Sequence, residues 1–124
     1  MLRLDENSKL QIVLSNTLYT NQIRAVANYS DHLGLSYVGS VNTALSNNTT
    51  PVDIVAAPAA GVIREIDFLS FYNLDSIYLT YLIVQAVVSS TTYVLHKTLM
   101  EPKSNLAYSH ALGWRKCMDG ALKF

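Results

Sequence analysis

The chain has 124 residues, the size of a single domain that can bury one sizeable hydrophobic core. Nine basic and nine acidic side chains cancel and only 15% of the residues are charged, so the sequence offers no basic field for a phosphate backbone and we expect no nucleic-acid partner. Half of the residues are apolar, which excludes a disordered chain. Because charge is so scarce, we expect part of the apolar surface to contact another protein, and we predict an oligomer.

In the first part of the chain, apolar residues alternate along short stretches. Residues 10–14 (LQIVL) place three aliphatic side chains on one face, which predicts a strand. Residues 18–27 contain the one weak candidate for a helix. A second strand is predicted over 35–41, and the polar loop 46–50 (SNNTT) follows it.

Predicted strands are denser after Pro51. They are expected at 52–56, 64–72, 77–87, 93–99, 106–109 and 114–118. Turn residues such as Pro58, Gly61 and Asn73 separate the first three of these strands. We therefore interpret these three strands as an antiparallel meander.

Two strands of this meander are hydrophobic on both faces. Regular alternation along the second strand places Ile66 and Phe68 on one face and Leu69 and Phe71 on the other. The third strand likewise carries aromatic and aliphatic residues at both parities. Strands with this pattern are expected to be covered on both sides.

An uncharged stretch between Asp75 and His96 raises the question of a membrane span. Its length is close to what a spanning helix needs. However, its second half is rich in Ser and Thr, and its apolar residues are mostly β-branched or aromatic. We interpret the stretch as strand, turn and strand, and we expect no membrane partner.

These elements predict an all-β fold. Eight or nine short strands separated by turn residues are typical of a β-sandwich, with jelly-roll connections as one alternative. We expect an extended N-terminal segment, with a strand or arm over 1–50 and a dense antiparallel β body over 51–124. Both parts are expected to belong to one domain.

The residues that carry chemistry form no recognisable catalytic or ligand-binding motif. The histidines His32, His96 and His110 lie far apart in the sequence, and the single cysteine, Cys117, has no partner at metal-ligand spacing. We expect no metal, no cofactor and no catalytic residue. A hydrolase would be indicated only if His96 or His110 lay beside a serine and a carboxylate.

Three stretches of strand-and-turn pattern cover most of the chain. They are the opening LRLDENSKLQIVLSN, the segment NNTTPVDIVAAPAAG leading into REIDFLSFYNLDS, and the late TLMEPKSNLAYSHALGWRKCMDGALKF. Together they resemble a family of small β-rich virion proteins of tailed bacteriophages. The chain differs from that family by carrying Tyr78, Leu79, Tyr81 and Leu82 where small polar residues are usual.

The resemblance implies a structural protein of the virion with no enzymatic activity. The role that we favour is a capsid decoration or cement subunit on the head surface, made in the cytoplasm of the bacterial host. Its partner would be the major capsid protein, and it would stabilise the head lattice by bridging neighbouring subunits. A tail, neck or fibre component is the alternative within the same class.

The residues expected at an interface are apolar or aromatic. Self-association is predicted through tyrosine-rich strand faces, with a trimer preferred and a dimer as the alternative. The N-terminal residues would either add a strand to the sheet of a partner or form a plain first strand of the same domain. The predicted interface residues are Leu2, Leu4, Ile12, Leu14, Tyr19, Tyr78 and Tyr81.

A carbohydrate-binding β-sandwich is the alternative from a different functional class. Trp114, Tyr108 and Tyr72 would then form a platform on which sugar rings stack. Saturable binding of host glycans would favour this alternative over a cement protein.

Overall fold

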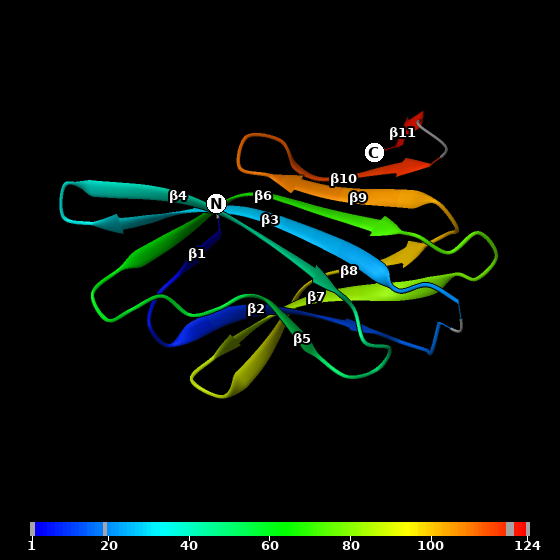
Figure 1. The fold of residues 1–124 in the computed structure, drawn as a ribbon, viewed down its shortest axis with the longest axis horizontal. Helices are drawn as coiled ribbons and strands as arrows, with labels where there is room; N and C mark the ends of the chain where they lie inside the picture. Colours follow the sequence, from blue (N-terminus) through cyan, green and yellow to red (C-terminus); the bar gives the residue numbers. More distant parts are fainter. Residues whose placement is uncertain (1, 19, 119–120, 124) are drawn as a thin grey trace.

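The computed structural model describes residues 2–18, 20–118 and 121–123, and it shows two antiparallel β-sheets packed against each other (Figure 1). The predicted all-β sandwich is confirmed. The weak helix candidate at 18–27 is wrong, because the chain is already in an extended strand from Ile23 onward. No helix among the described residues is long and apolar enough to cross a membrane.

The larger sheet, sheet A, has the strand order β11-β10-β9-β6-β3-β4, with β1 paired to β6 beside this path. The strands of sheet A are β1 (Leu2–Leu4), β3 (Ile23–Leu33), β4 (Ser36–Leu45), β6 (Ile63–Asn73), β9 (Ser104–Ser109), β10 (Gly113–Met118) and β11 (Ala121–Lys123). One edge of β6 is shared by two partners, since β1 pairs along 64–66 and β9 pairs along 68–72.

The smaller sheet, sheet B, has the order β5-β2-β7-β8. Its strands are β2 (Ser8–Leu14), β5 (Val52–Val55), β7 (Thr80–Val88) and β8 (Thr91–Met100). The alternation predicted for residues 10–14 is confirmed, because every second side chain of β2 is buried. The first fifty residues therefore supply a central strand to sheet B and three strands to sheet A, so the sheets do not divide at residue 50.

The predicted meander is wrong, although its three strands exist. β5 and β7 flank β2 in sheet B, whereas β6 belongs to sheet A. The segments 56–62 and 74–79 are too long for tight hairpin turns, and they carry the chain from one sheet to the other. Two hairpins, β3–β4 and β7–β8, have two-residue loops: Gly34–Leu35, with Gly34 at a φ of 58°, and Ser89–Ser90. A third hairpin, β9–β10, has a three-residue loop.

A β-bulge in β6 changes which side chains face the core. Asn28 pairs with Phe68 and Tyr29 pairs with Ile66, so Asp67 is an extra residue on β6. Ile66, Leu69 and Phe71 are therefore all buried, and Phe68 is on the exposed side. The prediction that Ile66 shares a face with Phe68 is wrong because the bulge interrupts the alternation, whereas the placement of Leu69 and Phe71 on the face opposite Phe68 is confirmed.

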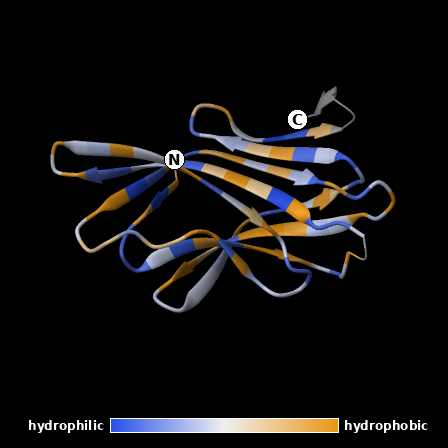
Figure 2. Ribbon diagram, viewed as in Figure 1, coloured by the Kyte–Doolittle hydropathy of each residue, from blue (hydrophilic) through white to orange (hydrophobic). Residues whose placement is uncertain are grey.

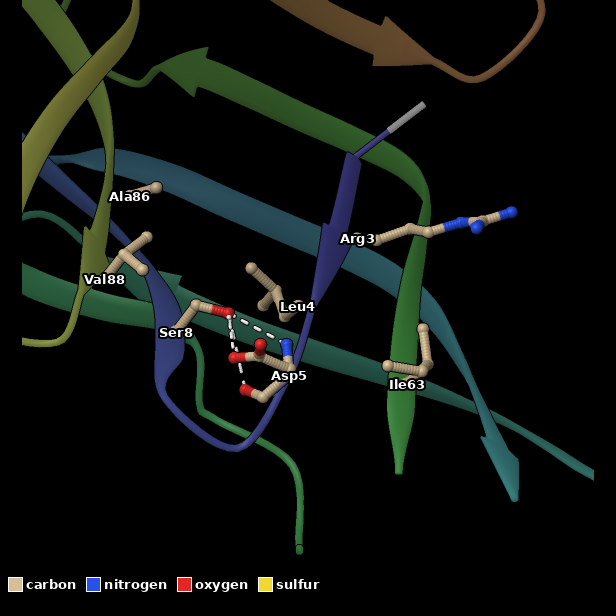
Figure 3. Close-up of a pocket in the computed structure, with 7 residues that line it drawn as sticks. All are labelled: Arg3, Leu4, Asp5, Ser8, Ile63, Ala86 and Val88. Carbon is tan, nitrogen blue, oxygen red and sulfur yellow. Dashed lines mark hydrogen bonds between the residues drawn. The ribbon is translucent and has the colours of Figure 1, made fainter. Parts of the chain in front are cut away.

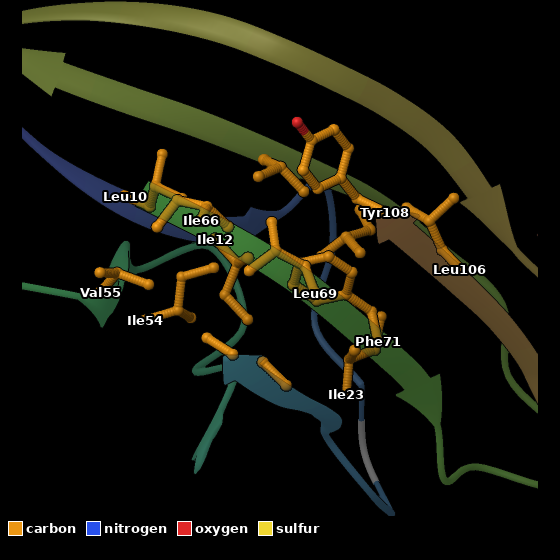
Figure 4. Close-up of a cluster of buried hydrophobic side chains, with 14 of the residues drawn as sticks. Leu10, Ile12, Ile23, Ile54, Val55, Ile66, Leu69, Phe71, Leu106 and Tyr108 are labelled. Carbon is orange, nitrogen blue, oxygen red and sulfur yellow. The ribbon is translucent and has the colours of Figure 1, made fainter. Parts of the chain in front are cut away.

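The core lies between the two sheets (Figure 4). Sheet B contributes the inward faces of β2, β5 and β7, and sheet A contributes those of β3, β6 and β9. The hydropathy colouring alternates along these strands, as expected when one face of each strand meets the core (Figure 2). The largest fully buried side chains are Phe71, Leu10, Ile12, Leu14, Ile23, Ile54, Ile66, Leu69, Leu82, Met100, Leu106 and Val55.

Candidate interaction surface

The most unusual surface of the described chain is β4, the strand at one edge of sheet A. β4 forms a hairpin with β3 that extends beyond the body of the sandwich (cyan in Figure 1). All of its residues except Ala44 are exposed, so neither face of β4 is covered along most of its length. We call Ser36–Leu45 the β4 edge and residues 33–35 the hairpin tip.

Large apolar side chains are concentrated on the hairpin tip and the β4 edge. Six of them are each more than half exposed: Leu33, Leu35, Tyr37, Val38, Val41 and Leu45. Together they expose on the order of 600 Å², taking roughly 150–200 Å² for each large side chain when fully exposed. This apolar surface is divided between the two faces of the hairpin, and its extent favours a protein–protein contact.

The β4 edge also lacks the charges that protect exposed strands from pairing with other chains. No charged residue occurs between residues 33 and 52. Other edge strands of the two sheets carry a charge: Arg3 on β1, Asp53 on β5 and Lys97 on β8. β5 is also short and follows a proline, and β8 contains a bulge. The β4 edge is thus the least protected of the described sheet edges.

The hairpin geometry determines which backbone groups of β4 point outward. Leu33 and Ser36 flank the two-residue loop and pair with each other, so even-numbered residues of β4 direct their N–H and C=O groups toward β3. The bond from Ser46 N–H to the Ile23 carbonyl, at 2.9 Å, continues this parity at the other end. Tyr37, Gly39 and Val41 therefore direct their backbone groups away from the sheet.

The hairpin is held near its tip by an ion pair between the neighbouring strands β3 and β6. Arg64 on β6 donates from Nε and Nη2 to the Asp31 carboxylate on β3, at 2.7 and 2.9 Å. Arg64 also donates from Nη1 to the Ala56 carbonyl and lies over the Tyr29 ring at 4.5 Å. The hydrogen bonds from Arg64 lower the pKa of Asp31, and the same contact raises the pKa of Arg64. Neither strand can shift along the other without breaking this contact.

A serine, a histidine and a glutamate meet on the outer face beside this ion pair, but they do not form a catalytic triad. Ser30 Oγ lies 3.2 Å from His32 Nε2, and Glu65 Oε2 lies 3.7 Å from the same nitrogen. A triad needs the nucleophile and the carboxylate on opposite ring nitrogens, and Ser30 is buried. Glu65 also pairs with Arg3 at 3.2 Å, so we interpret the cluster as a polar brace between β1, β3 and β6.

The two histidines considered for a hydrolase lie elsewhere. The His96 ring stacks on Trp114 with centroids 4.5 Å apart, and burial lowers the pKa of His96. His110 is exposed in the turn between β9 and β10. Within residues 2–18, 20–118 and 121–123, no group of three or more His, Cys, Asp or Glu residues is arranged to hold a metal ion.

A cleft of about 340 Å³ opens at one end of the sandwich (Figure 3). It is lined by Arg3, Leu4, Asp5, Ser8, Ile63, Ala86 and Val88. Its polar groups are already engaged with each other, because Ser8 Oγ accepts from the Asp5 N–H at 2.8 Å and donates toward the Asp5 carboxylate at 3.2 Å. The cleft therefore presents mainly apolar walls and no set of convergent polar groups.

The three aromatic residues considered for carbohydrate binding do not share one face. Tyr108 is buried and packs against Trp114, with ring centroids 5.0 Å apart, on the inner side of sheet A. Tyr72 follows the buried Phe71 and pairs with Asn105, which places it on the outer side of the same sheet. A single stacking platform from all three residues is therefore not formed.

The predicted interface residues are dispersed. Leu4, Ile12 and Leu14 are buried in the core, so they are not available to a partner, because the N-terminal segment packs as β1 and β2 of the sandwich. Leu2 is partly buried against the same core. Tyr78 and Tyr81 are exposed, but they lie on sheet B or the loop before it, away from β4. Tyr19 lies outside the described residues.

The strand predicted over 35–41 is confirmed as part of β4, but the sequence analysis did not identify it as an exposed sheet edge, although a signal was present. The run 33–52 is as free of charge as the stretch that raised the membrane question. Apolar residues within it are spaced by small and polar residues, so it shows no dense hydrophobic pattern. A strand that is exposed on both faces has no alternation from which to recognise it.

Comparisons of the chain with models of protein families, with curated proteins and with solved structures find no match. The surface chemistry of the β4 edge and the hairpin tip is therefore the main basis for a functional proposal.

Proposed function

We propose that the protein is a non-enzymatic structural subunit of a tailed-phage virion that acts by binding its neighbours. The observation that supports a binding role is the uncharged, apolar β4 edge with its hairpin tip, an arrangement that is costly to leave in water. The assignment to a virion comes from the sequence resemblance. A capsid decoration or cement subunit on the head surface is the role that we favour.

In this role the protein would contact the major capsid protein and stabilise the lattice by bridging adjacent subunits. The hairpin tip is suited to such a contact because Leu33 and Leu35 are exposed at the end of the β3–β4 hairpin, whose β3 strand is also paired with β6 as far as His32. A modest contact is sufficient, since repetition over a symmetric shell multiplies its effect. The anchoring pair Asp31–Arg64 would keep the tip in a fixed direction.

The proposal is tested on virions purified from infected cells. Mass spectrometry should detect the protein in the particle, and imaging at side-chain resolution should place it on the head surface at a copy number set by the lattice symmetry. A location in the tail, neck or fibre would replace the cement role with the alternative in the same class. Absence of the protein from purified particles would overturn the virion proposal.

A substitution at the hairpin tip tests whether this surface makes the contact. Leu35→Asp should reduce binding to heads that lack the protein by at least tenfold, because a charge would be placed in an apolar contact. Leu112→Asp is the matched control, since Leu112 is an exposed leucine in the turn after β9. Equal binding by the two variants would exclude the tip as the contact.

A further inference from the structure

We propose that two copies of the chain pair through their β4 edges, antiparallel about a two-fold axis, so that their A sheets join into one continuous sheet. This inference rests on the proposed role as an associating subunit, and it adds the surface and the symmetry of self-association. The partner at this surface is therefore a second copy of the same chain.

The backbone of the β4 edge offers hydrogen-bonding groups to a partner strand. Tyr37, Gly39 and Val41 direct N–H and C=O groups away from β3, and no described strand pairs with β4 on that side. Farther along, Asn42 donates from Nδ2 to the Ile54 carbonyl at 2.8 Å, so β5 approaches this end of the strand. The open part of the edge is thus the half next to the hairpin tip, and an added strand would satisfy its backbone groups.

The absence of charge on the β4 edge favours an uncharged partner strand. The edge has no charge over residues 33–52, so a charged peptide would gain no ion pair there. A second β4 edge is also uncharged and apolar, and the chain as a whole has a formal net charge of zero. Two copies therefore approach without repulsion, and each edge covers the apolar side chains of the other.

The exposed apolar area of the β4 edge can be compared with the area that a stable dimer buries. A stable dimer typically buries roughly 800 Å² per partner. The apolar side chains of the β4 edge without the tip provide on the order of 400 Å² of exposed surface at roughly 150–200 Å² per fully exposed large side chain. Backbone hydrogen bonds between the two β4 edges add to this apolar contact, so the pairing does not depend on side-chain area alone.

Gly39, in the middle of the open part of β4, sets the register of the two paired strands. Placing Gly39 on the two-fold axis sets Tyr37 of one copy opposite Val41 of the other. Aromatic and β-branched residues form favourable cross-strand pairs, and an aromatic neighbour shields the backbone at a glycine. A Cβ added at Gly39 would meet no atom within 4 Å, so the axis position is open in the single chain.

Sedimentation velocity of the purified full chain tests the pairing. The wild-type protein should sediment as a dimer at micromolar concentration, and Val41→Lys should weaken dimerisation at least tenfold by placing a charge at the paired edge. Val94→Lys on β8 is the matched control, because Val94 is 62% exposed and Val41 is 65% exposed. A wild-type monomer, or equal dimerisation of the two variants, would overturn the proposal.

A cross-link tests the register and does not depend on disrupting the contact. In a Cys117→Ser background, which removes the one native thiol, Gly39→Cys should form a disulfide-linked dimer under mild oxidation by oxidised glutathione. Val94→Cys in the same background should remain monomeric on a denaturing gel. Absence of the Gly39→Cys cross-link from a folded dimer would exclude this register.

The results separate the pairing from the virion role. A dimer in solution that never enters a particle would support the pairing and overturn the proposed function. A particle protein that stays monomeric in solution and shows no β4 contact on the particle would support the function and overturn the pairing. Circular dichroism and the unfolding midpoint of each variant establish that it is folded.

Discussion

At the scale of single residues, the buried polar groups of this protein are used to hold the fold. Asn73 is fully buried at the end of β6, and its amide donates to the carbonyls of Tyr78, Met100 and Glu101. Its Oδ1 accepts from the N–H of Asp75 at 3.0 Å. One amide therefore satisfies backbone groups from β8 and from the loops beside it.

We predict that Asn73→Ala lowers the free energy of unfolding by about 2–3 kcal/mol, because it leaves buried carbonyls without donors. Urea denaturation followed by tryptophan fluorescence measures this loss. Asn105→Ala on the neighbouring strand is the control, since Asn105 is only half-buried and makes a single long bond of 3.5 Å to Ser70. Similar losses for both variants would contradict the special role of Asn73.

The Asp31–Arg64 pair leads to a second prediction. The hydrogen bonds from Arg64 are the main cause of the lowered pKa of Asp31. Asp31 therefore contributes stability above its unfolded pKa of about 3.9, and this contribution is lost as pH falls through the lower folded pKa. Asp31→Asn should cost about 1–2 kcal/mol at pH 7, a range reduced for partial exposure. The cost should shrink at pH 3.

Unfolding midpoints of Asp31→Asn and the wild type at pH 7 and pH 3 measure this difference. Asp53→Asn serves as the control, because Asp53 is exposed and its bonds to Lys9 and Gln11 lie on the surface. A difference between Asp31→Asn and the wild type that stays the same at both pH values would contradict the assignment to the carboxylate charge.

At the scale of elements, the sequence predicted most of the strands but not how they pair. Alternation along β2 identified its buried face because β2 itself has no extra residue against either neighbour. The pattern failed at Asp67, where a bulge adds one residue, since a composition pattern does not reveal an extra residue within a strand. The pairing of β6 with β3 depends on contacts far apart in the sequence, which local turns do not specify.

The candidate surface shows the same limit. Ile12 and Leu14 were predicted from the sequence to lie at an interface, but their regular alternation places them in the core. Val41 and Tyr37 lie on an exposed strand, where no periodic burial constrains the sequence. Sequence periodicity thus identifies what the chain buries within itself, and the surface that it exposes emerges only when the edges of the sheets are known.

The β7–β8 hairpin offers a prediction at the element scale. Ser89 and Ser90 both have positive φ, 48° and 70°, as a type I′ turn requires, although serine is strained in this region. Replacing them by Asn-Gly should raise the free energy of unfolding by about 1 kcal/mol. Ser36→Gly on β4, where φ is not positive, should lower it. Thermal unfolding of both variants measures the difference, and no gain from Asn-Gly would contradict the turn assignment.

At the scale of the whole molecule, contacts between the sheets connect the two halves of the sandwich. Lys116 on β10 donates to the Leu99 carbonyl and pairs with Glu101 at 2.6 Å, just beyond the end of β8. The stacked rings of His96 and Trp114 join β8 to β10 nearby. These contacts close one end of the sandwich and leave the β4 edge, across sheet A, as the open one.

The contact between His96 and Trp114 makes the stability of the whole molecule depend on pH. Burial lowers the pKa of His96, so between this lower value and the unfolded value of about 6.5 the unfolded chain binds more protons than the folded chain. The contribution of neutral His96 to the free energy of unfolding is complete above pH 6.5 and decreases as pH falls toward the folded pKa. Protonation would place an uncompensated charge between the sheets.

We therefore predict that the urea midpoint of the wild type falls between pH 8 and pH 5.5, and that His96→Phe, which keeps a flat ring against Trp114, reduces this fall. His110→Phe is the control, because His110 is exposed in the turn between β9 and β10 and should leave the fall unchanged. Asp31 still carries its charge at pH 5.5, so its ion pair with Arg64 does not contribute in this window. If both variants followed the wild-type profile, the pH dependence would originate outside the contact between the sheets.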